Sequence, residues 1–228
     1  MGFKCLAYYK RLQLHSQPHT SMGILARPFK HLRFNFMSIV KLGFITPQAW
    51  VDAVLNDFDR FLLDHATAEK KASGMAMSML SHYPDRIELV NAMADLCIEE
   101  MTHFREVIKI VHQRGGYAGK DEKDPYVNEF RKVFRRGKDE YFLDRLLVGA
   151  IIEARGAERF GLIAEALEPG QLKNFYRSIT RSEERHNDLF IELAFLYFDK
   201  SDALERLDEL IIIEAEIVKQ LPIRAALH

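Results

Sequence analysis

The chain has 228 residues, of which 48% are hydrophobic and 29% charged, a composition typical of one globular domain with a substantial buried core. No apolar run approaches the ~20 residues of a membrane-spanning helix, which argues against a protein built on such helices. The two cysteines, Cys5 and Cys97, argue against a disulfide-stabilised secreted protein and lead us to expect a cytoplasmic one.

The net charge of −1 hides an asymmetry along the chain. Residues 1–51 contain seven Lys and Arg residues and no acidic residue, which leaves 25 basic against 33 acidic residues in the remainder. This balance argues against a uniformly basic nucleic-acid-binding protein, although local basic patches can still contact phosphates.

Residues 1–36 are aromatic and basic, and they lack an amphipathic pattern of helical length. We interpret them as a basic N-terminal extension that precedes a single domain over residues 37–228. A disordered arm and a start codon assigned upstream of Met22 or Met37 are the two explanations that we favour. A targeting peptide is the third, because the segment contains Arg residues and no acid.

The first predicted helix begins at Thr46-Pro47, a capping hydroxyl followed by a proline suited to the first helical position. Apolar residues recur every three or four positions from there to about residue 81, and Glu69 falls on this apolar stripe. After a turn at residues 83–85, a second helix follows and ends at Gly115-Gly116. Its stripe includes Glu100.

The second half of the chain repeats this organisation. Residues 115–138 are polar and charged, and they are long enough to cross a bundle from one helix pair to the next. Two further helices are predicted on either side of a turn at residues 168–170, with Glu153 on the stripe of the first and Glu183 on that of the second. A fifth helix over about residues 202–220 is expected to pack outside these four.

Two copies of one short pattern, Glu-x-x-His, lie on the second and fourth predicted helices. Each copy follows a lone glutamate, by 31 residues in the first half and by 30 in the second. Residues i and i+3 of a helix share a face, so each copy directs a carboxylate and an imidazole to one point. The predicted metal ligands are Glu69, Glu100, His103, Glu153, Glu183 and His186.

Taken singly, Glu69 could be a solvated acid and each Glu-x-x-His an exposed pair. Taken together, four carboxylates on apolar stripes would be costly to bury without cations. One Glu from each of two helices and one Glu-x-x-His from each of two others is the ligand pattern of ferritin-like di-iron and di-manganese proteins. The chain therefore resembles an all-α, ferritin-like four-helix bundle with a long crossover between its second and third helices and an extra C-terminal helix.

Four stretches also resemble the tRNA hydroxylase family. They are Thr46-Pro47-Gln48-Ala49-Trp50, Asp64-His65-Ala66-x-Ala68-Glu69-Lys70-Lys71, Glu99-Glu100-Met101-x-His103-Phe104 and Ile152-Glu153-Ala154-Arg155-x-x-Glu158-Arg159-Phe160. The resemblance covers about residues 46–220, includes all six ligand positions and leaves out the N-terminal extension. It implies a non-haem di-iron monooxygenase that uses dioxygen to hydroxylate the isopentenyl group of 2-methylthio-isopentenyl-adenosine, next to the anticodon in tRNA. Two iron ions suit the ligands, although manganese would accept the same set.

The implied partners are a tRNA anticodon stem-loop and a separate electron-donating reductase or ferredoxin. The second follows because the chain has no flavin-binding glycine pattern and no cysteines spaced for an iron–sulfur cluster. Candidate tRNA contacts are Lys70, Lys71, Arg131, Lys132, Arg135, Arg136, Lys173, Arg177, Arg181 and Arg185. For each patch, an ordinary solvated or ion-paired surface is an equally good explanation.

Two other functions fit the same residues. The first is a ferritin- or rubrerythrin-like protein that oxidises or stores iron or reduces peroxide, because its ligands would look very similar. The second is a non-catalytic, metal-stabilised RNA-binding protein. The sequence leaves the oligomeric state open.

Overall fold

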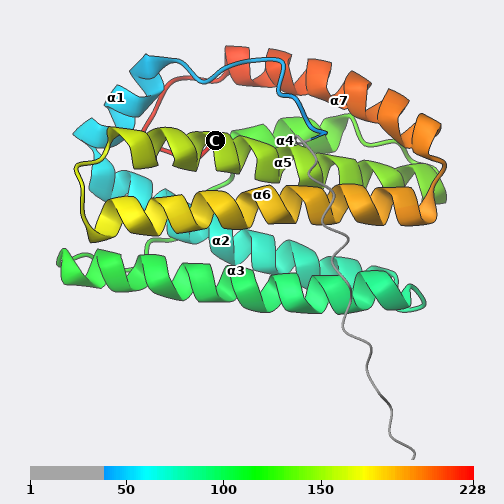
Figure 1. Ribbon diagram of the computed structural model, residues 1–228, viewed down its shortest axis with the longest axis horizontal. Coiled ribbons are helices and arrows are strands. Elements are labelled where there is room, and N and C mark those ends of the chain that lie inside the picture. The colour runs from blue at the N-terminus through cyan, green and yellow to red at the C-terminus, as the bar shows by residue number, and fades with distance from the viewer. Residues whose placement is uncertain (1–38) are drawn as a thin grey trace, which may run out of the picture. The chain divides into compact units, whose positions relative to one another are not determined.

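The structure is a computed structural model that describes residues 39–228, and within this range it contains helices and no strand (Figure 1). The predicted extension over residues 1–36 lies outside the described residues. The helices are α1 (Gln48–Asn56), α2 (Phe58–His82), α3 (Ile87–Gln113), α4 (Pro125–Lys132), α5 (Lys138–Ala166), α6 (Gln171–Tyr197) and α7 (Lys200–Gln220). Between residues 39 and 228, no helix combines the length and apolar character needed to cross a membrane.

Two helical hairpins form the bundle. Helix α2 packs along α3, α5 packs along α6, and the hairpins meet where α3 contacts α6. Helix α7 lies outside these four, against α5 and α6, as Figure 1 shows. The predicted all-α, ferritin-like bundle with a crossover and an additional C-terminal helix is therefore confirmed.

The prediction of one continuous helix from residue 46 to residue 81 is wrong, because the chain breaks at Asp57. This residue has φ −138° and ψ 60°, and its side chain accepts a hydrogen bond from the Arg60 backbone N–H at 3.4 Å. Asn and Asp hydrogen-bond to nearby backbone groups, so they favour helix ends over helix interiors. Asn56-Asp57 therefore ends α1 and caps α2.

The crossover also contains a helix, which the polar and charged character of residues 115–138 did not predict. Helix α4 begins at Pro125, and the carboxylate of Asp124 accepts hydrogen bonds from the backbone N–H groups of Tyr126 and Val127. This is a capped start with proline at the first helical position. Tyr126 and Phe130 of this short helix are fully buried, so the crossover is anchored to the bundle.

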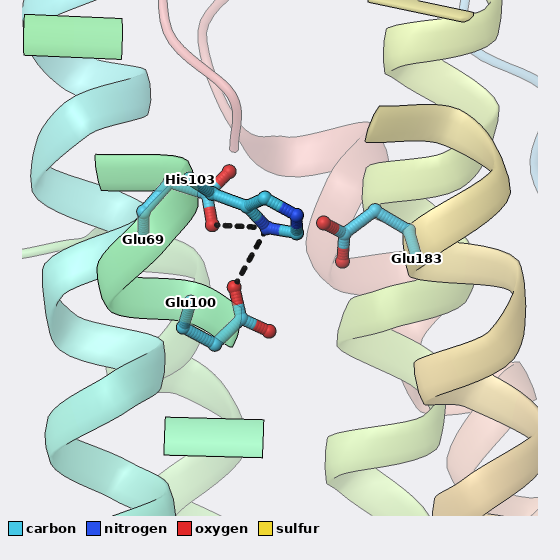
Figure 2. Close-up of side chains that lie close together, drawn as sticks. All are labelled: Glu69, Glu100, His103 and Glu183. Carbon is cyan, nitrogen blue, oxygen red and sulfur yellow. Dashed lines mark hydrogen bonds and ion pairs between the residues drawn. The ribbon is translucent and has the colours of Figure 1, made fainter. Parts of the chain in front are cut away.

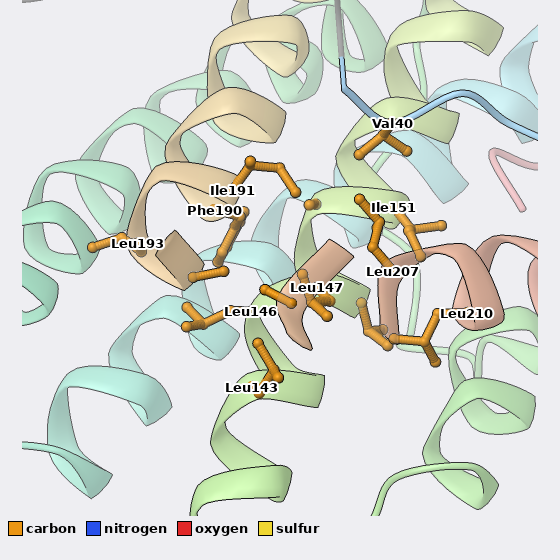
Figure 3. Close-up of a cluster of buried hydrophobic side chains, with 14 of the residues drawn as sticks. Val40, Leu143, Leu146, Leu147, Ile151, Phe190, Ile191, Leu193, Leu207 and Leu210 are labelled. Carbon is orange, nitrogen blue, oxygen red and sulfur yellow. The ribbon is translucent and has the colours of Figure 1, made fainter. Parts of the chain in front are cut away.

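The largest apolar core joins α5 to its neighbours on both sides. The members labelled in Figure 3 include Leu146, Leu147 and Ile151 of α5, Phe190 of α6, and Leu207 and Leu210 of α7. Burying one such side chain contributes roughly 1.5–3 kcal/mol. Gly149 lets α5 and α6 approach closely, because a Cβ there would lie 3.0 Å from a ring carbon of Phe190.

A buried carboxylate fastens the crossover to α5 and α7. Arg135 Nη2 donates to Asp144 Oδ1 at 2.7 Å, and Arg206 Nη2 donates to Asp144 Oδ2 at 2.9 Å. Although burial alone would raise the pKa of Asp144, the two guanidinium groups lower it. Arg135, a predicted tRNA contact, is therefore already engaged with a buried acid.

We expect Asp144→Asn to lower the free energy of unfolding by about 2–3 kcal/mol at pH 7, because it removes the charge that both arginines bond. A lowered carboxyl pKa stabilises the fold above the ordinary value of 3.8, and this contribution is lost as the pH falls through the pKa of the folded state. The deficit should therefore shrink below pH 3.8 in urea denaturation series. Asp139→Asn, at an exposed position of α5, is the control. A deficit of the same size at low pH would contradict the expectation.

After α7 the chain returns to the bundle and is buried again. Trp50 Nε1 donates to the Ala226 carbonyl at 3.0 Å, and the Leu227 N–H donates to Asp64 Oδ2 at 2.7 Å. Arg159 of α5 donates to the Leu227 carbonyl. These bonds fix residues 225–228 against α1, α2 and α5.

Candidate metal centre and adjoining pocket

The structure brings all six predicted ligands together inside the bundle. Helix α2 supplies Glu69, α3 supplies Glu100 and His103, α5 supplies Glu153, and α6 supplies Glu183 and His186. Each is buried, and none is more than 8% exposed. Figure 2 shows four of them, with the side chains from α2 and α3 directed toward Glu183 of α6.

The six side chains form two overlapping groups of four. One contains Glu69 and His103, the other contains Glu153 and His186, and both include Glu100 and Glu183. Within each group the nearest ligand atoms all lie within 4.8 Å of one another. Such an arrangement offers two cation positions, each with one imidazole and one carboxylate of its own and two carboxylates between them.

Both imidazoles turn Nδ1 toward the carboxylates. His103 Nδ1 lies 3.4 Å from Glu100 Oε2 and 3.6 Å from Glu69 Oε2. His186 Nδ1 lies 2.9 Å from Glu100 Oε1 and 3.7 Å from Glu183 Oε2. The contact between His186 and Glu100 is short but poorly directed, because neither Glu100 Oε1 nor either ring nitrogen of His186 makes a hydrogen bond of acceptable geometry.

The electrostatics of the cluster show how much negative charge is confined there. Burial and the Glu183 carboxylate raise the pKa of Glu153 well above its ordinary value, and burial together with Glu69 raises that of Glu100. Although burial would lower the pKa of His103, the carboxylates of Glu100 and Glu69 raise it to about 10. Without cations, this site must retain protons. The donor set and the unsatisfied atoms therefore fit divalent cations, which would replace those protons.

Glu99, which is not among the six predicted ligands, faces the Nε2 side of both imidazoles. Its Oε2 lies 3.3 Å from His186 Nε2, and its Oε1 lies 3.9 Å from His103 Nε2. Ser182 and Arg185 of α6 donate to the same carboxylate. Metal-binding histidines commonly donate their second N–H to a carboxylate, which fixes the ring and its tautomer. In the sequence, Glu99 stands out by its position next to Glu100, in a stretch that resembles the tRNA hydroxylase family.

His65 and Tyr176 support Glu69 from the other side. His65 Nε2 lies 2.6 Å from Glu69 Oε1, and its Nδ1 lies 3.3 Å from the Tyr176 hydroxyl. All three side chains are buried. Hydrogen bonds from His103 and His65 outweigh the effect of burial and lower the pKa of Glu69 to about 2. His65 thus holds Glu69 Oε1, while Glu69 Oε2 is directed toward the cluster.

A small cavity at the carboxylates adjoins a much larger pocket. The cavity, of about 50 Å³, is lined by Glu69, Glu100, Glu153 and Glu183 among others. The pocket, of about 640 Å³, lies between α2, α5 and the segment around α4, and no residue of α3 or α6 lines it. Cavity and pocket share Ala68, Ala72, Ile152, Glu153 and His228. Glu153 is thus the predicted ligand that also lines the pocket.

The pocket has apolar walls and a charged rim. Met75, Val127 and Ile152 contribute to the walls. The charged residues that line it, apart from Glu153, are Lys71, Lys123, Arg131, Arg145, Asp121, Glu122 and Asp124. Such a site accepts an apolar group at its inner end and phosphate or other polar groups at its mouth.

The predicted tRNA contacts divide between this rim and other surfaces. Lys71 and Arg131 line the pocket, and Lys71 also donates to the Glu122 carbonyl. Lys70 pairs with Asp121 at 2.5 Å, and Lys132 pairs with Glu129 at 2.6 Å. Arg136 is exposed.

The basic row on α6 lies away from the pocket. Lys173 Nζ donates to the carbonyls of Glu165 and Leu167 at the end of α5, and Arg177 pairs with Glu165 at 3.2 Å. Arg185 pairs with Glu99, and Arg181 is exposed. Part of this row therefore has partners within the chain, and its contact with RNA stays a prediction.

Comparison with known proteins agrees with this architecture. A curated relative from Pseudomonas putida, named tRNA 2-(methylsulfanyl)-N(6)-isopentenyladenosine(37) hydroxylase, is 33% identical over 78% of this chain and 86% of its own length. A relative of the same name from Salmonella typhimurium is 27% identical over 75% of this chain and 83% of its own length. A solved structure described as protein 43 with aldehyde deformylating oxygenase activity, from Synechococcus, superimposes with a TM-score of 0.77 at 31% identity. It covers 81% of this chain and 92% of that one.

The family match has nearly the same extent as the helical domain. Residues 36–228 match the family model described as tRNA-(MS[2]IO[6]A)-hydroxylase (MiaE). All six predicted ligands and the pocket that adjoins them lie inside this range. On this match and on the relative from Pseudomonas putida, the chain belongs to the MiaE family.

Proposed function

We propose that this protein is a non-haem di-iron monooxygenase that hydroxylates the isopentenyl group of 2-methylthio-isopentenyl-adenosine beside the anticodon of tRNA. The names of the two curated relatives support the reaction and the nucleoside. The observation that carries the chemistry is the pair of four-residue groups that share Glu100 and Glu183 and adjoin a pocket of about 640 Å³.

In this proposal Glu69 and His103 hold one iron, Glu153 and His186 hold the other, and Glu100 and Glu183 lie between them. Carboxylate and imidazole ligands suit ferrous iron, and manganese would accept the same set. When bound, the two ions would supply the activation of dioxygen that an allylic C–H bond requires.

The reaction balances as a monooxygenation. One atom of dioxygen enters the C–H bond as a hydroxyl group, and the other leaves as water after two electrons and two protons are added. The chain has two cysteines, Cys5 and Cys97, too few for an iron–sulfur cluster with four cysteine ligands, so the electrons come from a separate reductase or ferredoxin.

The pocket suits the two halves of this substrate. Ala68, Ala72 and Ile152 line both the pocket and the cavity at Glu153, and these apolar side chains suit a hydrocarbon group better than water. The ring system would lie farther out, which requires the base to leave the anticodon-loop stack. Lys71 and Arg131 at the rim would then lie near the sugar and phosphates.

The direct test is turnover on tRNA that lacks only the hydroxyl group. The protein, reconstituted with ferrous iron, is supplied with dioxygen, an electron donor and this tRNA, and the nucleosides are analysed by mass spectrometry. We expect the isopentenylated nucleoside to gain 16 mass units, roughly one oxygen atom, as a monooxygenase requires. Labelled dioxygen should provide that atom. Iron oxidation with no modified nucleoside would favour an iron-oxidising protein, and binding without turnover would favour an RNA-binding one.

The solved structure from Synechococcus supports a second candidate, because that protein is described as having aldehyde deformylating oxygenase activity. The apolar walls of the pocket would also accept an aliphatic aldehyde. A parallel assay with a long-chain aldehyde, monitored for formate, separates the two. The basic residues at the rim and the two curated relatives favour the nucleoside.

A further inference from the structure

His228 lies between the carboxylate cluster and the pocket, and neither the ligand set nor the proposed reaction uses it. It lines both the small cavity and the large pocket. Of the five residues shared by the two, His228 and Glu153 are polar, whereas Ala68, Ala72 and Ile152 are apolar. This imidazole therefore lies where the pocket adjoins the cavity, beside Glu153.

The ring of His228 is fixed on two sides. It stacks on Tyr126, with ring centroids 4.6 Å apart and an interplanar angle of 15°. Its Nδ1 lies 3.0 Å from Asp124 Oδ2. The residue is 8% exposed, and its Nε2 has no hydrogen-bond partner within residues 39–228. An unsatisfied ring nitrogen in a rigid, buried setting is costly unless a ligand bonds it.

The contact with Asp124 determines what Nε2 can offer. An ionised carboxylate accepts hydrogen bonds and does not donate them, and Asp124 Oδ2 faces Nδ1 at 3.0 Å. Nδ1 must then carry a hydrogen. In a neutral imidazole the other nitrogen is an acceptor, so Nε2 seeks a donor from the ligand.

We propose that His228 is a substrate-binding residue whose Nε2 accepts a hydrogen bond from the exocyclic N6–H of an N6-alkylated adenine. This inference rests on the proposed function. In such a base, N6 carries both the alkyl group and one hydrogen. The N6–H group that bonds His228 therefore lies at the start of the alkyl substituent, which must extend along Ala72 and Ile152 to Glu153. Recognition at this atom would place the isopentenyl group and would distinguish a secondary amine from other substituents.

The test compares two anticodon stem-loops that differ at one atom. The first carries N6-isopentenyl-adenosine, and the second carries O6-isopentenyl-inosine, in which an ether oxygen replaces the N–H. Binding to the iron-loaded protein is measured by fluorescence anisotropy without dioxygen, so that no turnover occurs. We expect the wild type to bind the N6–H ligand about 3- to 10-fold more tightly, the range of one hydrogen bond between neutral groups.

His228→Phe keeps a ring that can stack on Tyr126 but removes the acceptor, so its preference should fall to about 1-fold. Asp124→Asn tests the tautomer separately. Asp124 uses Oδ1 to cap α4 and Oδ2 to contact His228, so an asparagine that keeps the cap presents its NH₂ group to Nδ1. Nε2 then becomes a donor, and the preference should disappear or reverse. A merely structural role would weaken both ligands equally. Circular dichroism and iron content verify that each variant is folded.

Equal binding of the two ligands by the wild type would overturn the proposal. The proposal is also overturned if folded His228→Phe retains the wild-type preference. If His228→Phe does not fold, Asp124→Asn decides the question. Failure of the proposed function has a different result, because the wild type would then bind isopentenylated and unmodified stem-loops equally.

Discussion

Glu100→Ala is expected to remove both iron ions and to lower hydroxylation by more than about 100-fold, beyond the effect typical of residues that only support a metal ligand. Glu100 belongs to both four-residue groups, so its loss leaves each with three ligands. It also leaves an imidazole on each side without its nearest carboxylate, since His103 and His186 both contact Glu100.

Glu69→Ala provides the comparison that makes this prediction specific. Glu69 belongs to one group, so we expect about half of the iron to remain. Iron per chain is measured by mass spectrometry of desalted protein, and Glu184→Ala, at an exposed position beside Glu183, is the control. Two iron ions retained in Glu100→Ala would refute the ligand assignment. Equal losses of iron in Glu100→Ala and Glu69→Ala would refute the claim that Glu100 serves both groups.

The second large effect should come from blocking the place where the pocket adjoins the cavity while leaving the ligands in place. Ala72 lines both the cavity and the pocket, so Ala72→Phe would put a ring where the isopentenyl group must lie. We expect iron content to stay at the wild-type level and kcat/KM to fall at least about 100-fold, because the reacting carbon can no longer reach its position.

Ala166→Phe, at an exposed position at the end of α5, controls for the added bulk. Comparison of the tRNA affinities adds a second measurement. If the substrate reaches the centre through the pocket, Ala72→Phe should keep the contacts between the rim and the phosphates, and with them most of its tRNA affinity. It should chiefly lose the ability to place the alkyl group for reaction. Wild-type turnover in Ala72→Phe would show that the substrate reaches the centre by another route.

The ligand positions could be predicted because they depend on local periodicity. Glu69, Glu100, Glu153 and Glu183 each fall on the apolar stripe of a helix, and matching spacings in the two hairpins bring them to one level. Their burial follows from the same pattern. What periodicity cannot resolve is a short interruption, so the break at Asp57 and the helix α4 were missed.

Residues that complete the site through tertiary contacts had no such signal. Glu99 is one of two adjacent glutamates on α3, and only the packing of α6 brings Ser182 and Arg185 to it. His228 reaches the pocket because Trp50 and Asp64 bind the chain just before it. Contacts between residues more than 80 positions apart leave no periodic pattern in the sequence.

The crossover segment around α4 separates two tasks, holding the metal and admitting the substrate, which the four long helices would otherwise have to combine. The predicted ligands all come from the four long helices, whereas Asp124, Val127 and Arg131 of the crossover form an outer wall of the pocket. Substitutions in this wall can change which molecule is admitted without altering a ligand. A lineage could therefore acquire a new substrate while keeping its oxidative chemistry, and the Synechococcus protein of similar fold, described by a different activity, is the kind of relative that such a history would leave.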